Sequence, residues 1–211
     1  MRPHTPTTRS LSLLIPLLLS ACYPPFAEMQ SARLTGQGHH EFTGYYSSSG
    51  GENNGSSQKL YNHVGLAWST GVASNIDLRA RVERVSVTGE YGDAYTALSF
   101  GPKFSLNKDH VALNVPVGFA ISDGETSTWE VHPTLLFTAP VSKSFEFNPS
   151  AKLLLPLGGG SSTLMAVNVG AAIGTDVERW AIRPEVGFLF KPGDSGYAYH
   201  FGVGFSYRTG K

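Results

Sequence analysis

Charged side chains occupy alternate positions in several segments of this chain. In RWAIRPEVGFLF, Arg183 and Glu185 alternate with Ile182, Val186 and Phe188. A repeat of two residues indicates an extended strand, whose side chains point to its two faces in turn. One face of this strand is therefore charged and the other is apolar. Such charges can form ion pairs if neighbouring strands present charges to the same side.

The division into an apolar and a polar row recurs along the chain, between turn signals at short intervals. The predicted strands span approximately residues 38–47, 58–71, 75–88, 93–106, 109–122, 128–140, 143–157, 161–175, 178–190 and 197–208. No segment has convincing helical periodicity. These features predict an all-β fold, a single antiparallel up-and-down membrane β-barrel of about ten strands, although eight or twelve would also fit.

The direction of the apolar row separates two kinds of barrel. In a membrane barrel it faces lipid, whereas in a soluble lipocalin-like barrel it faces inward around an apolar ligand. Charged residues make up 15% of the chain, against roughly 25% in soluble domains, which favours the membrane. Aromatic residues also lie near the ends of the apolar rows, as in the girdles of membrane barrels. These are Trp68 and Trp180 at one set of turns, and Trp129, Tyr197 and Tyr199 at the other.

If the apolar row faces lipid, the charged row lines the lumen. The predicted lumen-lining charges are Asp77, Arg79, Arg81, Glu83, Lys103, Glu130, Glu146, Lys152, Arg179, Arg183, Glu185 and Arg208. We expect a salt-bridged filling, because ten strands are close to the eight-stranded size that side chains fill. The expected partners of Arg183 and Glu185 are Glu83 and Arg81. A narrow passage or a ligand cavity with a mild preference for anions is the functional alternative.

The start of the chain carries Arg2, Arg9 and the short apolar stretch LSLLIPLLLSAC, which predicts a secretory signal peptide. The four residues LSAC, which end at Cys22, resemble the lipobox of bacterial lipoproteins, whose cysteine becomes diacylated. Cys22 is the only cysteine in the chain, so it has no partner for an internal disulfide. The alternative is an ordinary signal peptide cleaved later, after Ala27. The expected organisation is a lipoprotein signal peptide at 1–21, a tether at 22–37 and a barrel domain at 38–211.

The links between the predicted strands differ in length. The odd-numbered links are SSSGGENNGSSQ, GEYGD, SDGETST, LGGGS and KPGDSG, and they are longer on average than GVASN, NKD, PVSK and TDVE. Bacterial outer-membrane barrels have short periplasmic turns, and an even strand number puts both termini in the periplasm. We therefore expect a lipid anchor on Cys22 at the periplasmic side. The residue after the cysteine is Tyr23 and not an aspartate. By resemblance to the sorting rules of enterobacterial lipoproteins, this permits transfer to the outer membrane.

Segments such as ALSFGPKFSLNKDHVALNVPVGFAIS and YHFGVGFSYR resemble small single-chain outer-membrane β-barrel proteins of Gram-negative bacteria. The resemblance is one of pattern, and it covers residues 36–208. It implies a porin-like barrel with membrane lipid as its surroundings and other outer-membrane proteins as candidate partners. Such barrels usually end on an aromatic residue, whereas this chain continues with RTGK after Tyr207.

Motifs for catalysis are weak. Lipid hydrolases of this membrane commonly carry His-x-Ser, and none of the histidines from His39 onward is followed by serine two residues on. The adjacent residues of HHE point to opposite faces of a strand, and GGG lacks the lysine and helix of a phosphate loop. The basic residues are scattered and the net charge is zero, so the sequence shows no basic patch of the kind that binds nucleic acid. We therefore expect no enzyme, metal or cofactor, but a structural component or a narrow passage for small solutes.

Overall fold

The structure, a computed structural model, describes residues 26–53, 56–87, 94–122, 125–126, 129–158 and 162–210. Its strands are β1 (His40–Asn53), β2 (Ser56–Ala73), β3 (Ile76–Val87), β4 (Tyr95–Asn107), β5 (Val111–Asn114), β6 (Val117–Ser122), β7 (Glu125–Thr126), β8 (Glu130–Val131), β9 (Thr134–Phe137), β10 (Ala139–Ser142), β11 (Phe145–Pro156), β12 (Leu164–Asp176), β13 (Trp180–Phe190) and β14 (Tyr197–Thr209). In this part of the chain, no helix is long and apolar enough to cross a membrane.

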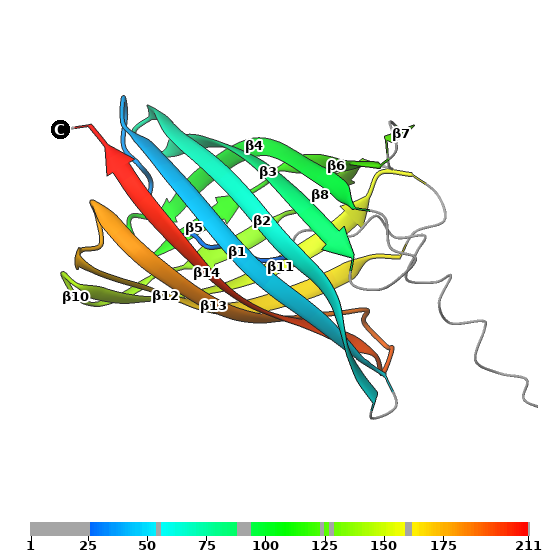
Figure 1. The fold of residues 1–211 in the computed structure, drawn as a ribbon. Coiled ribbons are helices and arrows are strands. Elements are labelled where there is room, and N and C mark those ends of the chain that lie inside the picture. The colour runs from blue at the N-terminus through cyan, green and yellow to red at the C-terminus, as the bar shows by residue number, and fades with distance from the viewer. Residues whose placement is uncertain are drawn as a thin grey trace, which may run out of the picture.

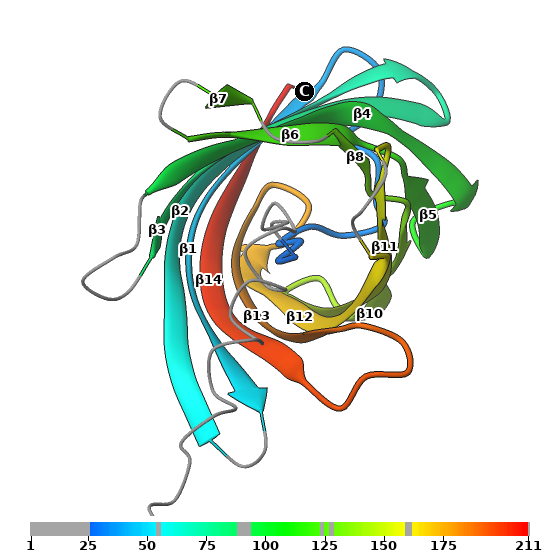
Figure 2. The same ribbon diagram turned by 90° about the vertical axis from the view of Figure 1, so that its right-hand side faces the viewer.

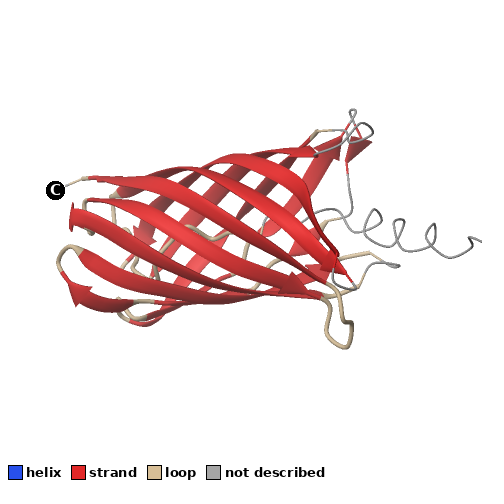
Figure 3. Cartoon of the chain, turned by 60° about the horizontal axis from the view of Figure 1, so that its bottom comes forward, coloured by secondary structure: helices blue, strands red, loops and turns tan. Residues whose placement is uncertain are grey.

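The strands form one closed antiparallel barrel (Figure 1). Strands β5 and β6 together act as one wall strand, and β8, β9 and β10 together act as another, so the wall has ten strands. The pairing of β1 with β14 joins the first wall strand to the last. The predicted ten-stranded up-and-down β-barrel is therefore confirmed. Figure 3 shows the strands tilted along the barrel, with the C-terminus at one end.

Prolines divide two wall strands that the sequence predicts as continuous. Pro116 lies between β5 and β6, and Pro133 lies between β8 and β9. A proline has no N–H to donate to a neighbouring strand, so the regular ladder is interrupted there. The barrel stays closed, because Val115 donates to the carbonyl of Pro102, and Leu153 donates to that of Pro133, at 2.9 and 3.0 Å.

The first hairpin is longer than the sequence predicts. Strand β1 continues to Asn53, and most of the expected link SSSGGENNGSSQ is paired strand. Serine and glycine give this segment no apolar alternation, so its sequence alone does not indicate a strand. Hydrogen-bonded neighbours on both sides decide its conformation, because β2 pairs with it up to Asn53 and β14 pairs with it up to Glu52.

The apolar rows face outward and the charged rows face inward. On β13, Ile182 and Phe188 are 46% and 48% exposed, whereas Arg183 and Glu185 are 2% and 3% exposed. The lipocalin-like alternative, in which the apolar row lines the interior, is therefore wrong. Buried charges at this density require partners, because an unpaired charge away from water costs several kcal/mol.

The two ends of the barrel differ. One end, here called the turn mouth, carries the short connections at residues 74–75, 108–110, 143–144 and 177–179, together with the end of β14. The other end, here called the loop mouth, carries the tip of the β1–β2 hairpin and the links that follow β3, β11 and β13. The start of β1 at His40 lies at the turn mouth, since it pairs with Thr209.

Residues 26–36, here called the plug segment, run through the inside of the barrel. Figure 2 looks along the barrel and shows this dark blue segment within the ring of strands. Phe26 packs near the loop mouth against Leu154 and Leu189, and Arg33 reaches Glu178 at the turn mouth. The sequence assigns these residues to a tether leading into the barrel, whereas the structure places them in the lumen.

Candidate functional site: a lumen closed by the plug segment

The wall recognises the backbone of the plug segment near the loop mouth. The Glu185 carboxylate accepts hydrogen bonds from the backbone N–H groups of Glu28 and Met29, at 2.7 and 2.9 Å. The side-chain amide of Asn168 donates to the carbonyl of Phe26 at 2.8 Å. Main-chain groups buried without partners would destabilise the fold, so these side chains are what allows an irregular segment to lie inside the barrel.

The same recognition continues toward the turn mouth. The N–H of Ala32 donates to Thr138 Oγ1 at 2.8 Å, and the N–H of Thr35 donates to Asp77 Oδ2 at 2.7 Å. Lys103 Nζ donates to the carbonyl of Arg33 at 2.7 Å. Charged and polar groups of the lumen therefore bind the backbone of the plug segment along its length.

Arg33 fixes the plug segment at the turn mouth. Its Nε donates to Glu146 at 2.9 Å, and its Nη1 donates to Glu178 at 3.2 Å. Burial by itself lowers the pKa of the Arg33 guanidinium, but the hydrogen bond and charge of Glu146 hold that pKa above its ordinary value. Arg33 therefore remains charged and paired.

Apolar side chains fill the remaining space. Phe26 is 1% exposed and lies edge-on to His200, with ring centroids 4.6 Å apart. Met29 has a φ of 49°, in the left-handed region, and its side chain reaches Gly202 on β14. A Cβ at Gly202 would lie 2.4 Å from Met29 Cε. The lack of a side chain at Gly202 therefore leaves room for the Met29 side chain of the plug segment.

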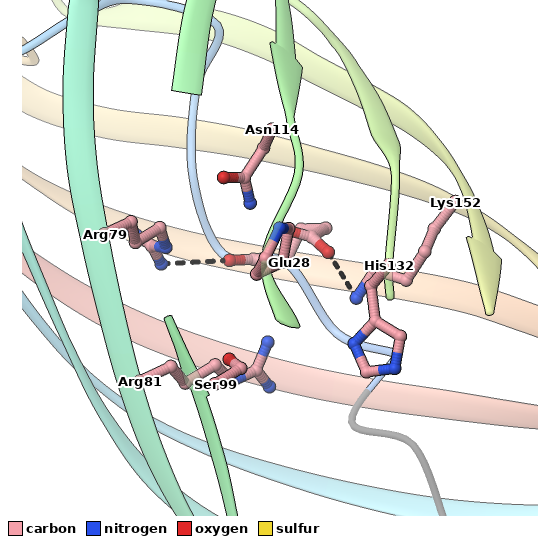
Figure 4. A pocket seen from close by; sticks show the side chains of 8 residues that line it. Glu28, Arg79, Arg81, Ser99, Asn114, His132 and Lys152 are labelled. Carbon is pink, nitrogen blue, oxygen red and sulfur yellow. Dashed lines mark hydrogen bonds and ion pairs between the residues drawn. The ribbon is translucent and has the colours of Figure 1, made fainter. Parts of the chain in front are cut away.

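Glu28 carries the central charge of the plug segment. Its carboxylate forms an ion pair with Lys152 and accepts a hydrogen bond from Gln30, and its carbonyl accepts one from Arg79. Figure 4 shows Glu28 between Arg79 and Lys152, which come from different strands. A cavity of about 20 Å³ adjoins these residues, which is enough for about one water molecule.

A second ionic group lies on the wall itself. The Glu83 carboxylate accepts hydrogen bonds from Arg81 and Tyr45, and its other oxygen lies 2.6 Å from His63 Nδ1. The opposite ring nitrogen of His63 lies 3.0 Å from Ser49 Oγ. This connectivity is that of a serine-histidine-acid triad. Ser49 is only 2% exposed and is not among the residues that line the cavity beside Glu28.

The sequence predicts the wrong partners for Arg183 and Glu185. Arg183 donates to Ser206 at 2.8 Å, and its guanidinium lies 3.9 Å from Glu41 and from Glu146. Glu185 binds the plug segment. Strand alternation gives the face of each side chain but not its neighbour across the lumen, which depends on how the sheet closes.

Nine of the predicted lumen-lining charges are buried inside the barrel: Asp77, Arg79, Arg81, Glu83, Lys103, Glu130, Lys152, Arg183 and Glu185. Glu146 is also buried, and Arg208 is half-buried beside Glu41, 3.1 Å away. Arg179 is exposed in the turn after β12, so its predicted place in the lumen is wrong. The sequence analysis did not identify Glu28, Glu41 or Asn168 as lumen residues.

The predicted girdle residues lie near the ends of the barrel. Trp68 and Trp180 are near the turn mouth, where Trp68 stacks on His40 at 5.9 Å between ring centroids. Trp129 and Tyr197 are near the loop mouth and are 47% and 37% exposed, and Tyr199 lies on the same strand as Tyr197. No three His, Cys, Asp or Glu residues in the described part of the chain are grouped to hold a metal ion. Cys22 lies outside the described residues.

Comparison with known proteins gives structural neighbours only. No protein-family model matches the chain, and no curated protein matches it. Ail, the attachment invasion locus protein of Yersinia pestis, is 14% identical, with a TM-score of 0.41 over 82% of this chain and 99% of that one. The translocator domain of the autotransporter NalP from Neisseria meningitidis is 12% identical, with a TM-score of 0.48 over 81% and 88%.

A third neighbour, an outer membrane channel from Pseudomonas putida, is 12% identical, with a TM-score of 0.42 over 82% of this chain and 96% of that one. The neighbours are small outer-membrane β-barrel proteins.

Proposed function

We propose that this protein is an outer-membrane β-barrel whose own plug segment closes its lumen, so that it is a structural component while plugged and a narrow passage when the segment leaves. The observation that carries the proposal is the set of hydrogen bonds between wall side chains and the backbone of residues 28, 29, 32 and 35. No catalysis is part of the proposal.

The outer surface supports a place in a membrane. Large apolar side chains are exposed on strands all around the barrel, including Phe42, Leu66, Phe100, Phe147, Val169 and Phe201, at 46% to 63%. Soluble monomers rarely expose contiguous apolar patches of more than a few hundred Å². Lipid stabilises such a surface, and the pairing of β1 with β14 closes the ten wall strands into a barrel.

The membrane proposal is tested by purification of the mature protein without its acyl anchor, with and without detergent. We expect it to be folded and monodisperse in micelles and to aggregate in buffer alone. A folded, monodisperse protein in buffer alone would contradict the membrane proposal.

The plug proposal is tested by conductance in planar bilayers. The full-length protein should conduct little, because the plug segment lies inside the barrel and is bound there by wall side chains. Replacement of residues 26–35 by ten glycine and serine residues should open a steady conductance. A folded replacement variant that conducts no more than the wild type would overturn the plug proposal.

A lipid anchor on Cys22 is a further part of the proposal. Cys22 is four residues from Phe26, and four residues of chain span at most about 14 Å. Phe26 packs at the loop mouth, so an acyl group on Cys22 would anchor near that end. The sequence predicts the anchor at the end with the short turns, which is the turn mouth. We instead propose the side of the loop mouth, because the plug segment crosses the lumen.

Two measurements test the anchor. Mass spectrometry should find diacylglyceryl on Cys22, and an unmodified N-terminus beyond residue 22 would end this part of the proposal. An epitope placed after Gly193, in the link between β13 and β14, should be labelled on intact cells if the loop mouth faces outward. Labelling only after the outer membrane is opened would put the loop mouth, and the anchor, on the periplasmic side.

A further inference from the structure

Three cations line the cavity beside Glu28 of the plug segment. Arg79 and Arg81 come from β3, and Lys152 comes from β11. Lys152 is paired with Glu28, and Arg81 is paired with Glu83. Arg79 donates to Ser69 at 3.0 Å and to the carbonyl of Glu28 at 3.4 Å, and it forms no ion pair with any acidic residue that the structure describes. The residues that line the cavity beside Glu28 thus include three cations and, apart from Glu28 itself, no acidic residue.

A cavity and an unpartnered polar atom lie at the same place. Asn114 lines the cavity of about 20 Å³ beside Glu28, together with Ser99 and His132. Asn114 is 3% exposed, and its Oδ1 has no hydrogen-bond partner. A side-chain amide supplies donors as well as an acceptor, so this group can turn toward a ligand. If the Glu28 carboxylate were withdrawn, the space it occupies would join the cavity.

We propose that this cluster is an anion-binding site, that Glu28 fills it in the plugged barrel, and that small carboxylates or phosphates bind there when Glu28 is absent. Guanidinium groups suit these ligands because their N–H groups match two oxygens of one oxyanion. The inference rests on the proposed function in one respect, because in the natural protein the site is free of Glu28 only when the plug segment has left the lumen. The open lumen then conducts anions better than cations.

The site can be tested without opening the lumen. Glu28→Ala keeps the plug segment and removes only the carboxylate, so acetate can replace the lost group. We expect acetate to raise the melting temperature of the folded Glu28→Ala protein in micelles and to leave that of the wild type unchanged at equal ionic strength. Addition of Lys152→Gln should weaken acetate binding about tenfold, because Lys152 is the cation that pairs with the Glu28 carboxylate and its loss removes one charge-assisted hydrogen bond.

Matched controls are available on β3 and at the barrel end. Arg84 on β3 is exposed on the outer surface, so Arg84→Gln should leave acetate binding unchanged. Glu178→Ala removes an exposed carboxylate and should create no acetate response. A folded Glu28→Ala protein that does not respond to acetate or to inorganic phosphate would overturn the anion site, whatever the conductance of the plugged barrel.

Ion selectivity provides a second, independent measurement. In the glycine–serine replacement variant, a potassium chloride gradient should give a reversal potential closer to the chloride than to the potassium equilibrium potential. Lys152→Gln should lower the ratio of chloride to potassium permeability about twofold or more. A conductance without chloride preference would mean that Glu185 or Glu130 takes the place of Glu28, and it would overturn the inference while the plug proposal stands. The absence of any conductance would contradict the plug proposal alone.

Discussion

The carboxylate of Glu185 accepts a 2.7 Å hydrogen bond from the backbone N–H of Glu28, a residue 157 positions earlier in the chain. The same carboxylate accepts a second bond from the next N–H, at 2.9 Å. A charge on the barrel wall thus holds the main chain of the plug segment. Its loss would leave two buried N–H groups without partners.

Glu185→Ala should therefore release the plug segment. Each buried N–H left unsatisfied costs about 1–3 kcal/mol. Trypsin cleaves after arginine, and the Arg33 side chain is 13% exposed, so cleavage there should be slow in the wild type and faster in the variant. Glu178→Ala removes only an exposed partner of Arg33, and a rate as fast as that of Glu185→Ala would contradict this role for Glu185.

Lys152 and Glu28 should be energetically coupled. Each single change to glutamine leaves one buried charge behind, which costs about 3–5 kcal/mol, whereas the double change removes both charges. The loss in unfolding free energy should therefore be smaller in the double variant than the sum of the two single losses. Denaturant unfolding in micelles measures the cycle, and additive losses would show that the ion pair is unimportant.

Gly202 should tolerate no side chain, whereas Gly204 on the same strand should. A Cβ at Gly202 would lie 2.4 Å from Met29 Cε and 2.7 Å from Ser47 Cβ, but one at Gly204 would have no neighbour closer than 3.4 Å. Gly202→Ala is expected to destabilise the barrel by about 1–3 kcal/mol through overpacking. Gly204→Ala is the matched control, and equal melting temperatures for the two variants would contradict the close packing of Gly202 against Ser47 and Met29.

The stability of the barrel should fall when a charge is placed at position 188 and should hardly change when only the shape of the side chain there changes. Phe188→Leu keeps an apolar group on the outer face, whereas Phe188→Arg puts a charge toward lipid. The cost of such a charge is up to about 2–4 kcal/mol at the midplane and falls toward the girdle, where Tyr199 pairs with Phe188. A cysteine scan of residues 180–190 with a lipid-phase quencher shows which of these side chains face lipid. Quenching is expected at 182, 186 and 188 and not at 183 or 185. Free labelling of 183 and 185 from bulk water would make the charged row an ordinary wet surface.

Ser49 should be chemically silent despite its contact with His63. A fluorophosphonate probe labels activated serines, but Ser49 is 2% exposed, so we expect no labelling of the folded wild type. The same probe on the glycine–serine replacement variant shows whether the plug segment shields Ser49. Labelling of Ser49 in the wild type would contradict a purely structural role for the Ser49–His63–Glu83 chain.

The sequence by itself determined the faces of the strands. Alternation along 179–190 is a local property of an extended chain, so it put Arg183 and Phe188 on opposite faces without knowledge of the neighbours. The low charge of the whole chain and the positions of its aromatic residues then favoured Arg183 as the inner residue, as the structure has it. The ten wall strands followed from the same repeat together with the turn signals. The sequence did not show that Ser49 and its neighbours continue β1, because serine and glycine do not alternate with apolar residues and the pairing on both sides decides their conformation.

Only the tertiary structure decided what the lumen contains. The plug segment has no apolar period, and the wall recognises mainly its backbone, which is the same for every sequence. The residues that bind it, such as Asp77, Thr138 and Glu185, lie 42 to 157 positions from their partners in the chain. They come together only when the sheet closes. Closure also gave Arg183 and Glu185 partners that no pattern along one strand contains.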